Sequence, residues 1–359
     1  MKLLNMIETR RPMMYEYVFD AAKKLDGVEV AEARWNGPDE LDYLSVKRKI
    51  EREGPGAFDV PQGYLDNPDT SILITSWVPI SAASMDAMKN LKVIGIIRAG
   101  LENIDIKAAT ERGILVINAG GHNAHAVSDF AIALILAETR NIGRLHHNMM
   151  NGIFATPRDQ SNIHDLYGMT IGLVGLGYIG SLMAKKLAGF EVNIISYDPY
   201  VKPEDAAKMG VKLVDKETLF KESDFVSVHA RLVPETRHMI GKNEIGLMKK
   251  TAFFINTARA GLVDTDALVE ALQEHRIAGA GIDVFDEEPL PQGHPYYSLD
   301  NVTLTPHRAG VTTEATTGSP RMVVERIGNL LRGEPVTGMV NGEVAQTPEF
   351  KAWLDSVKR

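Results

Sequence analysis

The sequence predicts an α/β fold built from two doubly wound parallel sheets. Short apolar runs rich in Val and Ile alternate with segments of helical periodicity along most of the chain, and this alternation is typical of βαβ units. The chain has 359 residues, which is about twice the length of a typical domain. Two separate cores are therefore expected.

The first alternating series begins at the N-terminus. We expect its strands at the runs KLLNMI, VEVAEARW, SILITS, KVIGII and ILVIN. Helical patterns separate these strands around residues 13–25 and 38–53 and in the runs SAASMDAMKN and IDIKAATERG. Residues 51–69 are rich in Gly, Pro and Asp, which predicts a surface loop.

A long helix is expected over about residues 124–150, followed by a second alternating series. Its strands are expected at TIGLVG, EVNIISYD, DFVSVH, TAFFIN, GAGIDVF and NVTLTPH. The last helical run, TEATTGSPRMVVERIGNLLRG, precedes a tail without strands, which we expect to pack on the first unit. We therefore expect one domain of residues 1–123 and 312–359, with residues 124–311 inserted as the other.

Composition excludes several classes of partner. The formal net charge is −8, which gives no general attraction to nucleic acid or to an anionic membrane surface. The chain has no cysteine, so disulfides, thiolate catalysis and Cys-ligated metals are excluded. The apolar run FAIALILA is far shorter than the roughly 20 residues that span a bilayer, and the N-terminus lacks a signal-peptide core. We expect a cytoplasmic protein without nucleic acid or membrane partners.

A Gly-rich turn follows the first strand of the second series. Gly175, Gly177 and Gly180 form the pattern G-x-G-x-x-G between a strand and a helix, as in Rossmann dinucleotide-binding units. There the glycines allow a tight turn, a close approach of the pyrophosphate and tight helix packing. We expect Tyr178 and Ile179 to contribute to the same site. Alone, the motif is weak, because Gly-rich turns are common.

Asp198 strengthens this interpretation. It ends the next strand, 23 residues after Gly175, close to the ~20 residues expected for the acid that binds the adenosine ribose. A carboxylate there would repel a 2′-phosphate, so NAD is favoured over NADP as the cofactor. The alternative is that Asp198 serves only as a turn residue before Pro199.

Three reactive side chains follow later strands of the second series. Arg259, Glu288 and His307 each lie just after an apolar run, at the sheet edge where α/β proteins bind ligands. An arginine can hold a carboxylate bidentately, and a histidine can exchange a proton near neutral pH. A carboxylate can orient that imidazole and favour its protonated form. The set fits oxidation of an alcohol next to a carboxylate.

The motifs VGLGYIG, NTARAGLVDTDAL, GAGIDVFDEEPLP and TPHRAG occur in this order. With them the chain, from about residue 70 to 335, resembles the D-isomer-specific 2-hydroxyacid dehydrogenases, which include phosphoglycerate dehydrogenase and glyoxylate/hydroxypyruvate reductase. The resemblance implies a Rossmann NAD-binding domain, residues 124–311, inserted into a flavodoxin-like substrate-binding domain, residues 1–123 and 312–359. It also implies hydride transfer between the nicotinamide of NAD(H) and a D-2-hydroxy acid or 2-keto acid.

The family's functional residues can be transferred position by position. Arg259 matches the arginine that binds the substrate carboxylate and keto group, Glu288 matches the partner of the catalytic histidine, and His307 matches the general acid/base. Asp286 and Glu287 lie in a variable part of the motif and are expected to be solvated surface charges. Four further positions match the family's cofactor side: His229, Thr236, Thr257 and Asp283. Packing alone could explain Thr257 and Asp283.

The substrate loop departs from the family. Its backbone N–H groups, including those of Ala99 and Gly100, are expected to bind the substrate carboxylate, but Arg98 stands where a small residue is usual. Further departures are His122, Asp129, Arg231 and Arg308. Because four of the five departures are basic, we hypothesise that Arg98, helped by Arg231 or His122, binds a second anionic group of the substrate. Alternatively, these residues pair with acidic neighbours such as Glu102.

Other interpretations remain open at this point. The same fold serves NAD(H)-sensing corepressors, which can retain the trio. Oxidation of formate or phosphite is disfavoured, because relatives with those activities depart from the pattern around the histidine's partner or in the substrate loop. No metal site is expected, because the adjacent His146 and His147 would lie on different faces of a helix. We expect a homodimer, by resemblance and because the helix containing AVSDFAIALILAET is unusually apolar for a surface helix.

Overall fold

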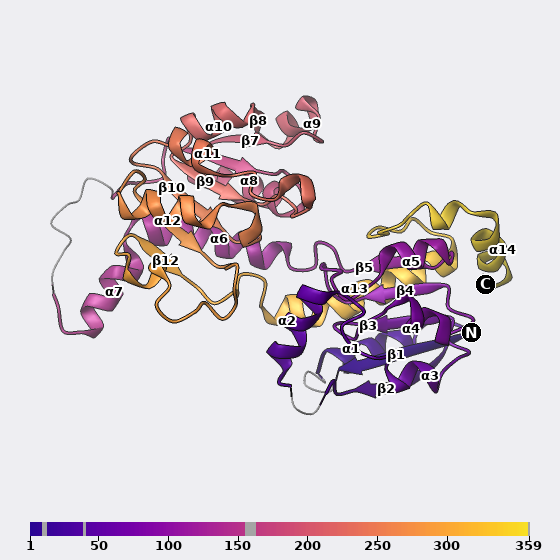
Figure 1. Ribbon diagram of the computed structural model, residues 1–359. Helices are drawn as coiled ribbons and strands as arrows, with labels where there is room; N and C mark the ends of the chain where they lie inside the picture. The colour runs from indigo at the N-terminus through magenta and orange to yellow at the C-terminus, as the bar shows by residue number, and fades with distance from the viewer. Residues whose placement is uncertain (9–12, 39–40, 155–162, 358–359) are drawn as a thin grey trace. The chain divides into compact units, whose positions relative to one another are not determined.

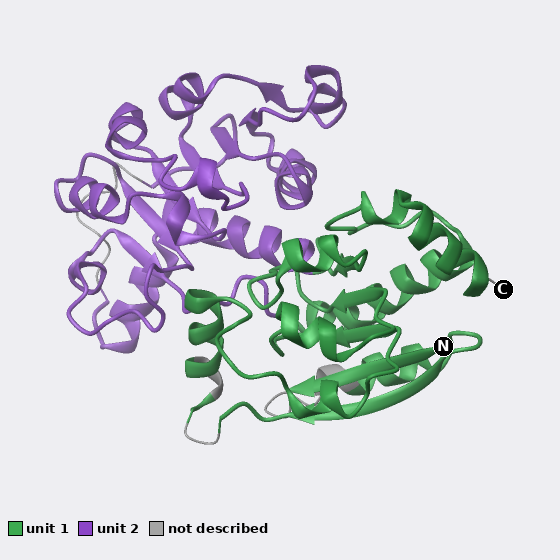
Figure 2. Cartoon of the chain, turned by 45° about the vertical axis from the view of Figure 1, so that its right-hand side comes forward, with its two compact units in different colours: residues 1–122, 312–359 green, residues 123–311 purple. Residues whose placement is uncertain are grey.

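The computed structural model describes residues 1–8, 13–38, 41–154 and 163–357. The chain divides into two compact units, coloured separately in Figure 2. Unit 1 contains residues 1–122 and 312–359, and unit 2 contains residues 123–311. Each unit has its own parallel sheet, so each is described by itself.

Unit 1 is built on parallel strands in the order β2-β1-β3-β4-β5 (Figure 1). The strands are β1 (Lys2–Glu8), β2 (Glu29–Trp35), β3 (Ile72–Thr75), β4 (Val93–Ile96) and β5 (Leu115–Asn118). This is the flavodoxin-like strand order. Along the strands, neighbouring residues enter different cores: Leu3 and Ile72 belong to one, Leu4 and Leu73 to the other. Both faces of the sheet are therefore covered, as expected for a parallel sheet.

The helices of unit 1 come from both ends of the chain. They are α1 (Met13–Ala22), α2 (Tyr43–Glu53), α3 (Gln62–Leu65), α4 (Ala82–Ala87), α5 (Ile106–Glu111), α13 (Thr313–Arg332) and α14 (Pro348–Val357), with a 3-10 turn, η5 (Val344–Gln346). Helix α13 packs on α1, β4 and β5. In the tail, Val344 and Phe350 are buried in the same core as α13. The expectation that the tail packs on the first unit is confirmed.

Unit 2 is built on parallel strands in the order β12-β11-β10-β9-β6-β7-β8. The strands are β6 (Thr170–Val174), β7 (Asn193–Tyr197), β8 (Lys212–Leu213), β9 (Phe225–Val228), β10 (Phe253–Asn256), β11 (Gly279–Ile282) and β12 (Val302–Leu304). Counted from β6, this is the Rossmann order 3-2-1-4-5-6, extended at one edge by β12. The predicted fold class, two doubly wound parallel sheets, is confirmed.

Helices and 3-10 turns connect these strands. The helices are α6 (Ala124–Thr139), α7 (Ile142–Met150), α8 (Tyr178–Leu187), α9 (Pro203–Lys208), α10 (Lys216–Glu222), α11 (Lys242–Leu247) and α12 (Thr265–Gln273). The 3-10 turns are η1 (Ala188–Phe190), η2 (Pro234–Thr236), η3 (Ala260–Leu262) and η4 (Pro295–Ser298). In the part of the chain that the structure describes, no helix combines the length and apolar character needed to cross a bilayer.

The prediction of one long helix over residues 124–150 is wrong in one respect. It breaks into α6 and α7 at Asn141, whose φ of 54° is left-handed and cannot continue a right-handed helix. The apolar character of α6 is explained within unit 2, because residues such as Ala131 and Ile135 are fully buried there and α6 packs on α8, β10 and β11.

Smaller differences concern the ends of elements. The helix expected from about residue 38 begins at Tyr43, where the Asp42 carboxylate accepts a hydrogen bond from the backbone N–H of Ser45 at 2.8 Å and so caps the first turn. The loop expected over residues 51–69 contains the short helix α3. Strand β8 and helices α10 and α11 were not predicted. They are short, so hydrophobic periodicity gives them little signal.

Candidate active site

The Gly-rich turn shows why each of its glycines is needed. Gly175 has a φ of 98°, and a Cβ there would lie 2.9 Å from the backbone N of Ala230. A Cβ on Gly180 would lie 2.2 Å from the carbonyl oxygen of Gly175. Gly177 caps the ten-residue helix α8, and a Cβ on it would meet nothing within 4 Å. Gly177 therefore leaves open space at a helix N-terminus, where backbone N–H groups suit a pyrophosphate.

The next two residues have different surroundings. Tyr178, in the first turn of α8, is 63% exposed, so its ring is available to a bound molecule. Ile179 is half-buried and packs against the core on one face of the sheet. A packing role thus explains Ile179, and its expected contact with a cofactor stays a prediction.

Asp198 lies directly after β7, as predicted, and its carboxylate joins two loops. Oδ2 accepts the backbone N–H of Leu176 at 2.8 Å, and Oδ1 accepts that of Tyr200 at 2.9 Å. The first bond ties Asp198 to the Gly-rich turn, and the second is the local bond of a turn residue. Both roles considered for Asp198 are therefore compatible with its contacts.

His229 directly follows β9 and lies next to the Gly-rich turn. Its Nε2 is 2.9 Å from the Ser227 hydroxyl, and its Nδ1 is buried with no partner among the described residues. Burial lowers the pKa of His229 to about 3, so the ring is neutral at physiological pH. A Cβ on Gly175 would lie 3.0 Å from the carbonyl carbon of His229, which places this residue next to the turn.

Thr236 shapes the loop after β9. Its hydroxyl accepts the backbone N–H of Val233 at 2.9 Å and donates to the carbonyl of Arg231 at 2.7 Å. The side chain of Arg231 is exposed. These bonds account for Thr236 structurally and leave its expected cofactor contact a prediction.

Thr257 and Asp283 are both buried. The Thr257 hydroxyl has no hydrogen-bond partner within the described residues, which leaves it able to bond a ligand. The Asp283 carboxylate accepts from the Thr305 hydroxyl at 2.6 Å and from the backbone N–H groups of Arg308 and Ala309 at 2.8 and 2.9 Å. Asp283 therefore fixes the loop that carries His307, a role that the sequence did not reveal.

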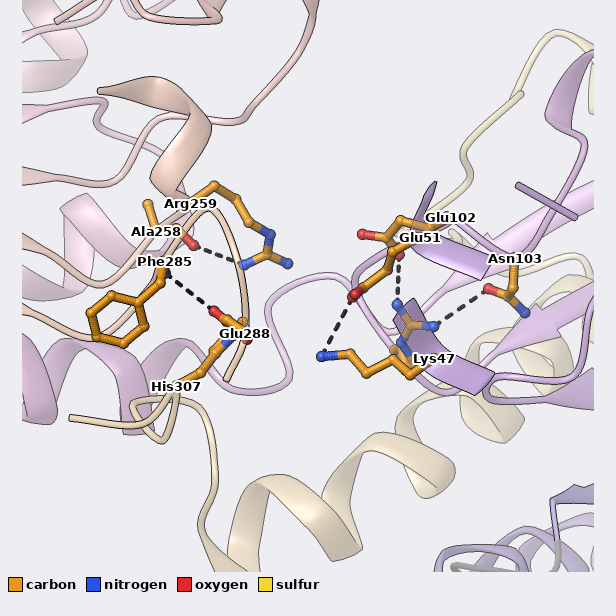
Figure 3. A network of polar contacts seen from close by, with 10 residues as sticks. Lys47, Glu51, Glu102, Asn103, Ala258, Arg259, Phe285, Glu288 and His307 are labelled. Atoms are coloured by element: carbon orange, nitrogen blue, oxygen red, sulfur yellow. Dashed lines mark hydrogen bonds and ion pairs between the residues drawn. The ribbon is translucent and has the colours of Figure 1, made fainter. Parts of the chain in front are cut away.

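His307 and Glu288 form a close pair. The Nδ1 atom of His307 lies 2.8 Å from Oε2 and 2.9 Å from Oε1 of Glu288. The backbone N–H of Phe285 donates to Glu288 Oε1 at 3.2 Å (Figure 3), and the Glu288–Pro289 peptide bond is cis. With its Nδ1 held by the carboxylate, the imidazole can present Nε2 to a substrate.

Arg259 follows β10 and completes the predicted trio. Figure 3 shows Arg259, Glu288 and His307 grouped on the loops after β10, β11 and β12, which are adjacent strands. The Arg259 side chain is exposed, and its Nη1 donates to the carbonyl of Ala258 at 2.8 Å. Asn256, which sequence analysis missed, holds this turn by accepting the N–H of Ala258 at 3.0 Å and donating to the carbonyl of Arg259 at 3.2 Å.

Arg98 belongs to unit 1 and has local partners. Its Nη2 lies 2.6 Å from Oε2 of Glu102, its Nη1 lies 3.5 Å from Oδ1 of Asn103, and its guanidinium carbon lies 3.0 Å from the centre of the Trp77 ring. Figure 3 includes Glu102 and Asn103 of this group. The pairing with Glu102 that we considered as the alternative is therefore present, and the anion-binding role stays a prediction.

The neighbouring loop residues are also ordered by local contacts. The carbonyl of Ala99 accepts from the Asn118 side chain at 2.8 Å, and a Cβ on Gly100 would lie 2.5 Å from Glu102 Oε2. His122 Nδ1 lies 2.8 Å from the carbonyl of Ala119. Burial lowers the pKa of His122, opposed by this hydrogen bond and assisted by the charge of Arg98. His122 is thus neutral at pH 7 and adds no positive charge to the loop.

The two remaining departures, Arg308 and Asp129, and the histidine pair are exposed. Arg308 is exposed, and Asp129 forms an ion pair with Lys186 at 2.5 Å. His146 and His147 are exposed on α7. Within the described ranges, no group of three or more His, Asp or Glu residues is arranged to hold a metal ion.

A Rossmann-type unit with a Gly-rich turn defines a class of dinucleotide-binding proteins, and here the contact between His307 and Glu288 lies at the same edge of the sheet as that turn. Residues 132–309 match the family model described as D-isomer specific 2-hydroxyacid dehydrogenase, NAD binding domain. The chain is 43% identical over 268 residues to a glyoxylate reductase of Thermofilum pendens, which covers 74% of this chain and 79% of that protein. The chain belongs to the D-isomer specific 2-hydroxyacid dehydrogenase family.

Two further comparisons agree with this assignment. The chain is 42% identical over 271 residues to a D-3-phosphoglycerate dehydrogenase of Methanocaldococcus jannaschii, covering 75% of this chain and 51% of that protein. It therefore spans about half the length of this relative. A solved structure from Lactobacillus delbrueckii ssp. bulgaricus, an NAD-complexed D-isomer specific 2-hydroxyacid dehydrogenase, matches with a TM-score of 0.74 and 26% identity over 95% of this chain and 100% of that one.

Proposed function

We propose that the protein is an NAD(H)-dependent D-2-hydroxyacid dehydrogenase that interconverts a 2-hydroxy acid and the corresponding 2-keto acid. The observation that carries this proposal is the pair formed by His307 and Glu288, 2.8 Å apart, in a unit that belongs to the NAD-binding domain family. The preference for the D isomer rests on the family alone.

The residues of unit 2 can each be given a role. A bound nicotinamide supplies or accepts the hydride. In reduction, His307, protonated and paired with Glu288, donates a proton from Nε2 to the carbonyl oxygen of the 2-keto acid, while Arg259 binds the substrate carboxylate and polarises the keto group. In oxidation, neutral His307 removes the hydroxyl proton. The two directions should therefore have opposite pH preferences.

Turnover measurements test this function. NADH oxidation is followed with glyoxylate and other 2-keto acids for wild type and His307→Gln, and NADH binding is measured in parallel by fluorescence. We expect His307→Gln to lower kcat at least about 100-fold with little change in NADH binding. If wild type binds NADH but turns over no 2-keto acid, the dehydrogenase proposal is wrong. That result would favour the corepressor-like alternative, which the comparisons do not support.

We propose that the enzyme prefers NAD over NADP because of Asp198. Its carboxylate sits beside the Gly-rich turn, bonded to the N–H of Leu176 at 2.8 Å, where it could accept bonds from a ribose hydroxyl and repel a 2′-phosphate. The variant Asp198→Asn removes this charge. We expect its NADH/NADPH ratio of kcat/KM to fall about tenfold or more. An unchanged ratio would show that Asp198 is only a turn residue.

We also propose that the loop of residues 98–100 binds substrate and that Arg98 recognises a second anionic group. The guanidinium is held in one orientation by Trp77 and Glu102, and a preorganised planar guanidinium suits a phosphate or carboxylate. The Glu102 carboxylate would compete with the substrate anion for the positive charge of Arg98.

A matched pair of substrates tests this role of Arg98. D-3-Phosphoglycerate and D-glycerate differ only in the phosphate. We expect Arg98→Ala to lower the ratio of their kcat/KM values about tenfold, and Glu102→Gln to raise it. The second-anion role is rejected if Arg98→Ala leaves the ratio unchanged.

We propose that the protein is a homodimer and that α7 contributes to the interface. Arg144 ties the start of α7 to the fully buried side chain of Glu138 at 3.0 Å, yet no described residue of α7 is buried. Apolar side chains are exposed on α7 and just after it, which is typical of an interface: Ile142, Met149, Met150, Ile153 and Phe154.

Light scattering tests this assembly. Wild type is expected at twice the monomer mass of 39.5 kDa, and the double variant Ile142→Asp/Met149→Asp at the monomer mass. Phe190→Asp, which changes an exposed apolar residue elsewhere in unit 2, is the control and should remain dimeric. A monomeric wild type would reject the proposal.

A further inference from the structure

A pocket of about 220 Å³ lies beside the segment that carries Glu288. Its described lining comes from unit 2: residues 284–287, 290–291, 294 and 296, with Thr265 of α12. Arg259, Glu288 and His307 are not among the lining residues, so the pocket is separate from the acid/base pair. Its volume is below the roughly 300–1,000 Å³ of drug-sized sites, which limits an occupant to a small molecule.

The charged residues of the pocket are all acidic. Asp286 and Glu287 line it, and no Lys or Arg is among its described lining residues. The Asp286 carboxylate is fixed by the Thr265 hydroxyl, which donates to Oδ2 at 2.5 Å. His294 Nδ1 accepts the backbone N–H of Tyr296 at 3.2 Å, so this nitrogen carries no proton. The pocket therefore favours a positively charged occupant.

Aromatic rings form the other part of the lining. The rings of Phe285 and Tyr296 meet edge to face with centroids 6.3 Å apart, and those of His294 and Tyr296 lie 4.8 Å apart. Such rings attract cations.

Tyr296 also offers an unused polar group. The residue is only 4% exposed, and the structure gives its hydroxyl no hydrogen-bond partner among the described residues. Burial, with the nearby charges of Asp286 and Asp266, raises the pKa of Tyr296, so the hydroxyl stays neutral. A ligand N–H in the pocket could donate a hydrogen bond to this hydroxyl oxygen.

We propose that this pocket binds a small organic cation, an alkylammonium or arylammonium ion, and that the occupant regulates turnover. The ammonium group would bond to Asp286 and to the Tyr296 hydroxyl, and its apolar part would pack on Phe285. Phe285 connects the pocket to the acid/base pair, because this residue lines the pocket and its backbone N–H donates to Glu288 Oε1 at 3.2 Å. The regulatory part of this inference rests on the proposed dehydrogenase function.

Calorimetric titration of the full chain with benzylammonium chloride tests the site, with benzyl alcohol as its neutral analogue. We expect benzylammonium to bind at least about tenfold more tightly than benzyl alcohol, because a charge-assisted hydrogen bond is lost with the charge. Asp286→Asn and Tyr296→Phe should each weaken benzylammonium binding, the first by about tenfold. Glu204→Gln, which changes an exposed acid on α9, should bind like wild type.

Three results would overturn the inference. Equal binding of benzylammonium and benzyl alcohol would make the pocket a purely apolar site. Unchanged affinity in both Asp286→Asn and Tyr296→Phe would place the bound cation elsewhere on the protein. If benzylammonium binds but leaves kcat and KM unchanged at saturation, the regulatory role is wrong. Because calorimetry needs no turnover, failure of the binding site is distinguishable from failure of the proposed function.

Discussion

The Nδ1 atom of His307 lies 2.8 Å from Oε2 of Glu288, and the two residues come from loops that follow adjacent strands, β12 and β11. A carboxylate in this position fixes the orientation of the imidazole. Since His307 itself has a φ of 54°, the loop presents the ring from a backbone conformation that few residues adopt. The position of the imidazole ring thus depends on Glu288 and on the loop that carries His307.

Replacing Glu288 by glutamine should lower kcat. The variant Glu288→Gln keeps the size of the side chain but removes the negative charge that contacts Nδ1 of His307. We expect kcat for 2-keto acid reduction to fall about 100-fold, measured by NADH oxidation. Glu204→Gln on α9 is the matched control and should retain wild-type kcat. Wild-type kcat in Glu288→Gln would show that the pair has no catalytic role.

Replacing Asp283 by asparagine should disturb the His307 loop. The amide side chain could not accept all three hydrogen bonds that the Asp283 carboxylate receives, and its own N–H groups would face backbone donors. We expect the free energy of unfolding to fall by about 1–3 kcal/mol and kcat of the folded variant to fall more than tenfold. Thr305→Val removes only the hydrogen bond from the Thr305 hydroxyl to Asp283. It should have a smaller effect on both the free energy of unfolding and kcat. If kcat of folded Asp283→Asn equals that of wild type, Asp283 contributes to packing only.

Two glycines of the turn, Gly177 and Gly180, should respond differently to alanine. Gly177→Ala places a methyl group in open space, so we expect stability within about 0.5 kcal/mol of wild type but NADH affinity reduced at least about tenfold, because the methyl occupies the approach of the pyrophosphate. Gly180→Ala forces a contact of 2.2 Å with the Gly175 carbonyl and should destabilise the protein.

Gly189→Ala serves as the control for these variants. A Cβ on this exposed glycine also meets nothing within 4 Å, so Gly189→Ala should change neither the stability nor the NADH affinity. Thermal unfolding and fluorescence titration with NADH measure the two effects. If Gly177→Ala binds NADH as tightly as wild type, the cofactor does not approach at Gly177.

The stability of unit 2 should depend on pH through His229. Its pKa is about 3 in the folded protein and near 6.5 when unfolded, so between these values the unfolded state binds more protons. The contribution of His229 to the free energy of unfolding is therefore fully present above pH 6.5 and is lost as the pH falls toward 3. From pH 7 to pH 5 the loss from His229 is about 2 kcal/mol.

Urea unfolding at these two pH values measures this contribution. We expect His229→Gln to lose about 2 kcal/mol less than wild type between pH 7 and pH 5, whereas the exposed His146→Gln should behave like wild type. The same pH dependence in His229→Gln and wild type would contradict the assignment.

The fold class, the order of the strands along the chain and the residues of the Gly-rich turn could be predicted from the amino-acid sequence. These follow from local patterns: apolar runs, helical periodicity and glycines at fixed spacing, which a single stretch of chain displays. The sequence also indicated Arg259, Glu288 and His307 as a set, because each follows a strand of one parallel sheet. The break at Asn141 was missed, since it depends on a left-handed backbone conformation, which hydrophobic periodicity does not reveal.

The partners of the polar side chains, in contrast, became evident only in the folded chain. Asp283 has no evident structural role until its contacts with residues 305–309 are seen, and the pocket at Tyr296 requires Thr265 to meet residues 284–296. Arg98, an unusual base in the sequence, lies against Trp77 and Glu102. Hydrogen bonds, ion pairs and burial depend on residues brought together by folding, so their strength cannot be derived from spacing along the chain.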